Sequence, residues 1–164
     1  MPRRSKQGDI EPIRVRLLDL LGNFKKELGS PNLRAKVQAL VPAYHLLRDL
    51  GSSLIPREEA SSGIDRVLSY LRKYPLTIVE GDELMVVSGI GEWARRVRQL
   101  RVQFGWWIYS GVTFTTIAED AKNAGNEAEI TSMKTTLGVD PSKIKPDKSA
   151  LTKLGNLSLL GFSR

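Results

Sequence analysis

The segment from residue 92 to residue 111, EWARRVRQLRVQFGWWIYSG, constrains the fold most, because it predicts an arginine-rich amphipathic helix that runs directly into an aromatic strand. At about 100° per residue, the apolar stripe of a helix over residues 92–104 is centred on Val97. The residues within about 60° of that centre are Trp93, Ala94, Leu100, Arg101 and Phe104. A basic helix followed by a hairpin is the order with which a winged helix-turn-helix places one helix in the DNA major groove.

The polar side of this helix carries the candidate DNA contacts. They are Glu92, Arg95, Gln99 and Gln103, which point away from the apolar stripe, and Arg96 and Arg98 on its flanks. A guanidinium group can bind guanine or phosphate with two hydrogen bonds, and a glutamine amide can bind adenine in the same way. The alternative is an ordinary solvated helix face. Charge alone does not separate the two interpretations, but the neighbouring elements favour DNA.

Arg101 and the aromatic residues of the strand need separate explanations. Arg101 lies near the core side of the helix, where an unpaired charge is costly, so we expect it to reach Asp82 or Glu83 or to extend along the surface. Strand alternation turns Trp106 and Ile108 to one face and Trp107 and Tyr109 to the other. We expect these aromatic residues mainly to cover the core. The alternative is that Trp107 or Tyr109 stacks on a base or contacts the DNA backbone.

The N-terminal part of the sequence predicts helices. Residues 1–12 predict a flexible basic tail, and residues 13–51 a helical subdomain. Within this subdomain, Gly29 ends the first helix, and Pro42 breaks the chain between a second and a third helix. Residues 52–63, rich in serine, glycine and proline, predict a linker.

Residues 64–114 predict the winged helix-turn-helix itself. A helix closed by Tyr74-Pro75, a short strand at 76–79, a helix at 82–87 and a glycine turn at 88–91 precede the basic helix. Residues 115–164 predict a helical and irregular extension, with one or two helices around Gly125. Its closing segment, residues 149–164, either supplies the missing strand of the wing or is poorly ordered. The predicted fold class is mainly α with a small β-hairpin (α+β), a helical N-terminal subdomain followed by a winged helix-turn-helix.

Composition limits the partners and the chemistry. In 164 residues, 25 Lys and Arg against 18 Asp and Glu give a net charge of +7, which favours a polyanionic partner such as double-stranded DNA. The chain contains no cysteine, which excludes disulfides, thiol catalysis and cysteine-based metal sites. It shows neither a secretory signal nor an apolar run long enough to cross a membrane, so we expect a cytoplasmic protein with no membrane partner.

The sequence offers little for catalysis. His45, the only histidine, lies in the apolar segment AYHLLRDL, and an HNH nuclease needs histidine both as metal ligand and as general base. The carboxylates Glu80, Asp82 and Glu83 have no lysine close by in the sequence and suit a helix N-terminus better than a metal site. We therefore expect no catalytic residue, metal or cofactor.

Several segments resemble bacterial HNH-type endonucleases in the winged-helix region ahead of the nuclease domain. They are YHLLRDLGSSLIP (44–56), YPLTIVEGDELMVVSGIGEWARRVRQLRVQFGWWIYSGVTF (74–114) and, more loosely, IAED and LGVDPSKIKPD (137–147). The resemblance implies a DNA-binding module with contacts from Arg95, Arg96, Arg98 and Gln99. Relatives continue past IKPD into a second winged module and the nuclease, whereas this sequence runs through KSALTKLGNLSLLGFSR. We therefore expect a truncated or divergent version of a longer protein.

The favoured function is DNA recognition without cleavage, as in the targeting part of an HNH endonuclease. A second function is a winged helix that grips another protein through Trp107 and Tyr109, either in a homo-oligomer or with a separate nuclease. An active nuclease ranks last.

Overall fold

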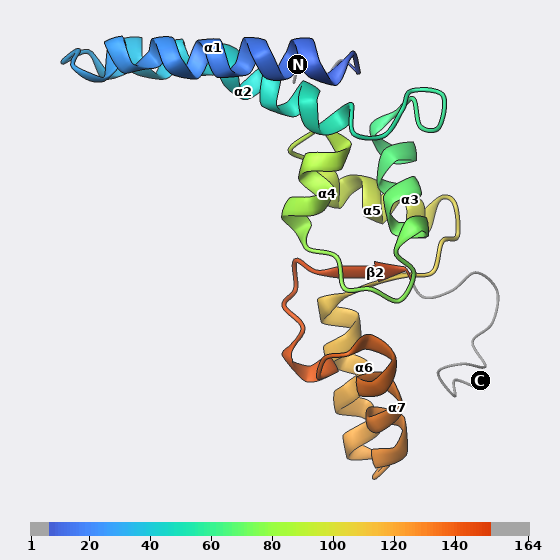
Figure 1. Cartoon of the computed structure of the whole chain (residues 1–164). Helices are drawn as coiled ribbons and strands as arrows, with labels where there is room; N and C mark the ends of the chain where they lie inside the picture. Colours follow the sequence, from blue (N-terminus) through green and yellow to red (C-terminus); the bar gives the residue numbers. More distant parts are fainter. Residues whose placement is uncertain (1–6, 152–164) are drawn as a thin grey trace. The chain divides into compact units, whose positions relative to one another are not determined.

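The computed structural model describes residues 7–151, which are mostly helical (Figure 1). This part contains seven α-helices, one short 3-10 helix and one two-stranded antiparallel sheet, which confirms the predicted mainly helical class with a small sheet. The elements are α1 (Ile10–Leu28), α2 (Leu33–Ser52), α3 (Gly63–Lys73), α4 (Gly81–Ser88), α5 (Trp93–Val102), β1 (Ile108–Ser110), α6 (Gly111–Asn123), α7 (Glu127–Leu137), η1 (Pro141–Lys143) and β2 (Ser149–Leu151).

The described chain divides into two compact units. The first contains residues 7–66 and 85–93, and the second contains residues 67–84 and 94–151. Helices α3 and α4 each contribute residues to both units. The boundaries of tail, subdomain and linker given above stay predictions; α1 begins at Ile10, inside the segment 1–12 predicted as tail.

The first unit contains a hairpin of two long helices, α1 and α2, which lie side by side (Figure 1). The Asn32 side chain starts α2 by accepting a hydrogen bond from the backbone N–H of Ala35, at 3.2 Å. The predicted break at Pro42 is wrong, because α2 continues through this residue to Ser52. Pro42 is exposed, so water can reach the carbonyl group that loses its helical hydrogen bond there.

Two arginine side chains hold the end of α4 and the turn that follows it. Arg48 donates from Nε (2.9 Å) and Nη2 (2.7 Å) to the carbonyl oxygen of Gly89. Arg66, which is buried, donates from Nε to the Val87 carbonyl oxygen at 3.0 Å and from Nη2 to that of Ser88 at 2.5 Å. Burial lowers the pKa of Arg66, while the carbonyl groups of Val87 and Ser88 accept hydrogen bonds from its guanidinium group. These bonds fix the backbone of the predicted glycine turn.

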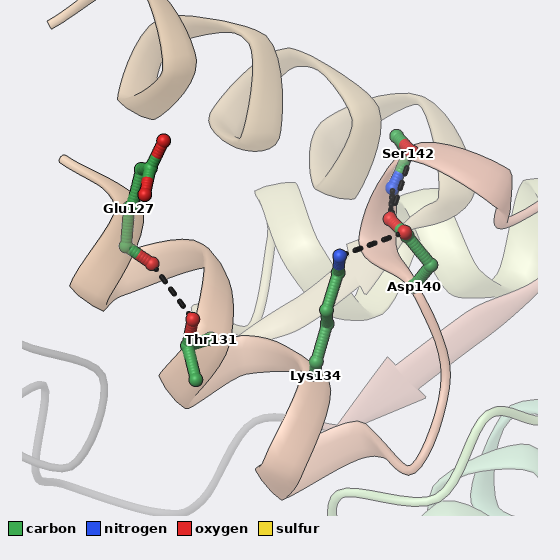
Figure 2. A network of polar contacts seen from close by, with 5 residues as sticks. All are labelled: Glu127, Thr131, Lys134, Asp140 and Ser142. Carbon is green, nitrogen blue, oxygen red and sulfur yellow. Dashed lines mark hydrogen bonds and ion pairs between the residues drawn. The ribbon is translucent and has the colours of Figure 1, made fainter. Parts of the chain in front are cut away.

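The second unit closes its core around α6 and α7. Phe114, Met133, Leu137, Ile144 and Ala150 form one buried cluster, to which α6, α7, β2 and the end of η1 contribute. Figure 2 shows how the chain turns after α7: Asp140 accepts hydrogen bonds from the Ser142 backbone N–H and hydroxyl group and pairs with Lys134 Nζ at 3.0 Å. Together these contacts hold the pKa of Asp140 at about 2, with the Ser142 hydroxyl group as the largest cause.

The sheet joins segments that are distant in the sequence. β1 pairs with β2 in antiparallel register, with Tyr109 opposite Ala150 and Ser110 opposite Ser149. On its other side, Ser149 exchanges backbone hydrogen bonds of 2.8 and 2.9 Å with Val79. β2 begins at the first residue of the closing segment that was a candidate wing strand. Residues 152–164 and 1–6 lie outside the described part of the chain.

The hairpin prediction needs one revision. Residues 111–148, with α6, α7 and η1, connect the two paired strands, so the sheet lacks the short turn of a β-hairpin, and its second strand comes from the closing segment, one of the two alternatives given above. Among residues 7–151, every helix is too short or too polar to cross a lipid bilayer.

Candidate nucleic-acid interface

Helix α5 presents a buried side and an exposed cationic side. Val97 and Leu100 are buried, as the predicted stripe requires, whereas Arg95 and Arg98 are exposed. Arg96 and Gln99 are half-buried and bind each other, since Arg96 Nη1 donates to Gln99 Oε1 at 3.1 Å. Glu92 and Gln103 are exposed and lie just outside the helix bounds.

The buried stripe of α5 is shorter than predicted. Phe104 was placed on the buried face, but its side chain is 60% exposed. The reason is that α5 ends at Val102, and Gly105 then adopts a positive φ of 67°. The Trp106 backbone N–H bonds back to the Leu100 carbonyl oxygen at 3.0 Å. The helix therefore ends before Phe104, so the helical projection of 100° per residue does not predict where that side chain lies.

Of the two alternatives expected for Arg101, exposure at the surface is the one found, rather than pairing with Asp82 or Glu83. Glu83 instead accepts a hydrogen bond of 2.6 Å from the Tyr70 hydroxyl group and one of 2.9 Å from the Glu80 backbone N–H. Arg101 is exposed and lies three residues after Arg98. Arg95, Arg98 and Arg101 therefore follow one another at three-residue spacing, which keeps successive side chains adjacent on a helix surface. That spacing is the signal in the sequence that could have added Arg101 to the candidate contacts.

An open groove lies between the end of α5 and β1. Its volume is about 620 Å³, and it is lined by Arg98, Arg101, Val102, Gly105, Trp106, Trp107, Ile108 and Tyr109. The groove brings together three of the predicted contacts, Arg98, Trp107 and Tyr109. Arg95, Arg96 and Gln99 do not line it. The site thus combines guanidinium groups with aromatic side chains, which together bind phosphates and the faces of bases.

The aromatic residues of the groove differ in their availability. Trp107 is 46% exposed. Tyr109 is half-buried and packs edge-on against Phe114, with ring centroids 5.7 Å apart, so part of its ring belongs to the core. The Trp106 ring has the guanidinium group of Arg72 over it at 5.8 Å. Trp107 is therefore the aromatic residue best placed to meet a ligand, and Arg72 is a neighbour of the groove that sequence reasoning missed.

The acidic residues near Val79 have partners within the protein. Glu80 pairs with Lys148 Nζ at 2.8 Å, and this hydrogen bond is the main reason that the pKa of Glu80 is lowered. The hydrogen bond from Tyr70 to Glu83 is the main reason that the pKa of Tyr70 is raised to about 12. Lys148 thus reaches the Glu80 carboxylate group, although the two residues lie far apart in the sequence. Across the described residues, no group of three or more histidine, aspartate or glutamate side chains could hold a metal ion.

Comparison with known proteins places the chain in a family. Residues 64–151, more than half of the sequence, match the family model described as the KpnI N-terminal domain. The chain belongs to the KpnI N-terminal domain family. KpnI is a restriction enzyme and an HNH-type endonuclease, so the match confirms the coarser part of the resemblance seen in the sequence. The matched region runs from the second residue of α3 to the last residue of β2 and includes α5 and the groove. No curated protein and no solved structure matches the chain.

Proposed function

We propose that residues 64–151 bind double-stranded DNA without cutting it, and that α5 is the helix that enters the major groove. The observation that carries the proposal is the exposed row Arg95, Arg98 and Arg101, whose last two members share a groove with Trp107. Guanidinium groups along one helix face can bind both phosphate oxygens and guanine edges. The relationship to a restriction enzyme makes DNA the natural polyanion for this surface.

The arrangement of the second unit supports a winged-helix interpretation. A winged helix-turn-helix places its last strand between the strand that precedes the two helices and the strand that follows them. Here β2 lies between Val79, which precedes α4, and β1, which follows α5. In this proposal, α6, α7 and η1 occupy the place of the short wing loop. The wing becomes a packed helical unit next to the DNA-facing groove.

The proposal assigns recognition, and no bond-breaking step, to this chain. One histidine cannot serve as both the metal ligand and the general base of an HNH site, and His45 lies half-buried beside Tyr44 with ring centroids 6.0 Å apart. The carboxylate groups Glu80 and Glu83 are engaged by Lys148 and Tyr70. The predicted contacts of Arg96 and Gln99 are ranked below those of Arg98 and Arg101, because Arg96 and Gln99 are bonded to each other.

Equilibrium binding of a fluorescent duplex tests the proposal. We expect Arg98→Ala/Arg101→Ala to weaken binding about tenfold or more at physiological salt, and to reduce the slope of log affinity against log salt by up to about 1.8, since each lost phosphate contact removes about 0.9. The matched control is Arg16→Ala/Arg34→Ala, which removes the same charge from exposed positions on α1 and α2. Equal losses in both variants would mean that net charge alone attracts the DNA. Absence of duplex binding by the parent protein would refute the proposal and favour a protein partner.

A further inference from the structure

Helix α2 carries an apolar stripe on its exposed side. Its members are Leu33, Val37, Leu40, Tyr44 and Leu47, which are separated by alternating steps of four and three residues. Their exposed fractions range from 39% at Leu40 to 73% at Leu33. Alternating steps of three and four residues are the spacing with which one helix packs against another in a coiled coil. The stripe therefore has the geometry of a helix-packing seam that residues 7–151 leave uncovered.

Helix α1 carries a second exposed apolar stripe. Ile10, Leu18, Leu21 and Leu28 are between 43% and 57% exposed. They lie roughly a quarter of a turn beyond the half-buried stripe of α1, which consists of Ile13, Leu17, Leu20 and Phe24. α1 buries no residue completely. More than a third of a turn of this helix is thus apolar, and only part of that arc is shielded within the first unit.

The two exposed stripes lie on the same side of the hairpin. The inner stripe of α2 is centred on Ala39, Ala43 and Leu50. Around the helix axis, the exposed stripe is rotated from this inner stripe by roughly a third of a turn. The direction of this rotation, viewed from the N-terminus of each helix, is the same on α2 as on α1. The two helices run in opposite directions and face each other (Figure 1). When two antiparallel helices face each other, stripes that are rotated in the same sense from the facing sides lie on the same side of the plane that contains both helix axes. The stripes therefore combine into one apolar face, which we call the hairpin face.

We propose that the hairpin face binds the hairpin face of a second copy of this chain, so that two hairpins form an antiparallel four-helix bundle. The spacing of the α2 stripe favours a second copy, because Leu33 and Leu47 are each seven residues from Leu40. A two-fold axis passing near Leu40 brings Leu33 of one copy against Leu47 of the other, and the reverse. This mutual exchange is what a closed symmetric interface requires.

The size of the hairpin face fits a dimer of two identical chains. A helix of 19 or 20 residues is about 28–30 Å long, and two helices side by side are about 20 Å wide. The exposed stripe of α2 ends at Leu47, because the next position, Gly51, is buried against Val86. Each copy would therefore cover roughly 500 Å² and the pair about 1,000 Å², which is the size at which a specific interface begins. Arg14, which projects among the exposed apolar residues of α1, is already paired with Glu11 at 2.6 Å. Lys25, which is exposed on the same arc, lies in the last turn of α1, where the helix dipole favours a cation. Neither charge therefore calls for an acidic partner.

Light scattering on the full chain without DNA tests the dimer. We expect the parent protein at about 0.1 mM, above the micromolar dissociation constants of ordinary complexes, to have twice the chain mass of 18.3 kDa. Leu40→Glu/Tyr44→Glu should have the mass of one chain and an unchanged helical circular dichroism spectrum. The control Val112→Glu/Val139→Glu changes two exposed apolar residues of the second unit and should remain a dimer. A monomeric parent protein, or a dimer that survives the substitutions at Leu40 and Tyr44, overturns the proposal.

A cross-link provides a second test, because the chain has no cysteine. Leu40→Cys places one thiol beside the proposed two-fold axis, where two copies can meet within the Cα separation of about 4.4–6.8 Å that a disulfide needs. Mild oxidation should convert most of this variant to a covalent dimer, whereas the exposed Val112→Cys should stay largely monomeric on a denaturing gel. Equal yields from both variants would contradict the proposed axis. Neither test involves α5, so this inference and the proposed DNA binding can fail independently.

Discussion

The hairpin of α1 and α2 and the pair of α6 and α7 use similar apolar residues with opposite results. The longer pair leaves α1 without a buried residue, whereas the shorter pair buries Phe114, Met133 and Leu137. The difference is a third layer. β2 and the segment around Ile144 close over α6 and α7, so that the cluster is covered on more than one side. Two helices alone cannot bury both of their apolar arcs, whatever their length.

Two substitutions by alanine, one in the α6–α7 core and one in the hairpin, test this difference most strongly. Phe114→Ala should lower the free energy of unfolding by about 3–5 kcal/mol, because it opens a cavity in a covered core. Leu18→Ala, at a side chain that is 55% exposed, should change it by less than about 1 kcal/mol under conditions in which the protein is monomeric. Urea unfolding measures both. Similar losses in the two variants would mean that the hairpin carries as much of the stability as the α6–α7 core.

Two helical glycines should respond with opposite signs. In Gly111→Ala, the new methyl group would overlap the backbone carbonyl group of Lys145, and we expect a loss of about 3 kcal/mol. Gly22→Ala, inside α1, meets no neighbouring atom within 4 Å and should stabilise the hairpin by about 0.5–1 kcal/mol through helix propensity. Thermal unfolding of the two variants gives the comparison. A stabilising Gly111→Ala would show that the approach of the η1 segment to α6 is looser than described.

The smallest effect concerns the turn after α7 and depends on pH. The lowered pKa of Asp140, about 2, means that the ionised group stabilises the second unit fully above its ordinary value of 3.8, and that this contribution is lost as the pH falls towards 2. Asp140→Asn should therefore lower the melting temperature at pH 6, and the difference from the parent should shrink at pH 2.5. A difference that is constant with pH would show that the carboxylate charge plays no part in holding Lys134 and Ser142.

Local sequence rules predicted the helices and turns of the central region well, but the strand expected at 76–79 is reduced to a single bridge at Val79, because Leu76 lies in a turn with a φ of 60°. The short helix α4, the turn with Gly89 and the two helices on either side of Gly125 follow from periodicity and glycine placement. The break at Pro42 failed because an exposed proline can be accommodated when solvent satisfies the freed carbonyl group. The sequence left open whether the closing segment supplies the second strand, because no local pattern reports that Ser149 pairs with both Val79 and Ser110.

The candidate site was predicted only in part, for similar reasons. Projection of α5 placed Val97 and Leu100 correctly in the core, but the projection extended beyond Val102, where the helix ends. The helical projection also placed Arg101 near the core side, from which it was expected to reach Asp82 or Glu83 or to extend along the surface; it is exposed. In the structure, Tyr70 and Lys148, from other segments, bind the neighbouring carboxylate groups of Glu83 and Glu80. Hydrogen-bond and ion-pair partners from distant segments depend on the tertiary fold, and the spacing of residues in the sequence does not predict them.

The central claim is that DNA meets α5 and the groove, and that it does not meet the hairpin. Two-dimensional NMR of the labelled chain, titrated with a short duplex, tests this directly, because the three tryptophan indole N–H groups give separate signals. We expect the largest shifts at the backbone amides of α5 and at the Trp107 indole, with small shifts along α1 and α2. Shifts concentrated on α1 and α2, with α5 and Trp107 unmoved at saturating duplex, would contradict the account.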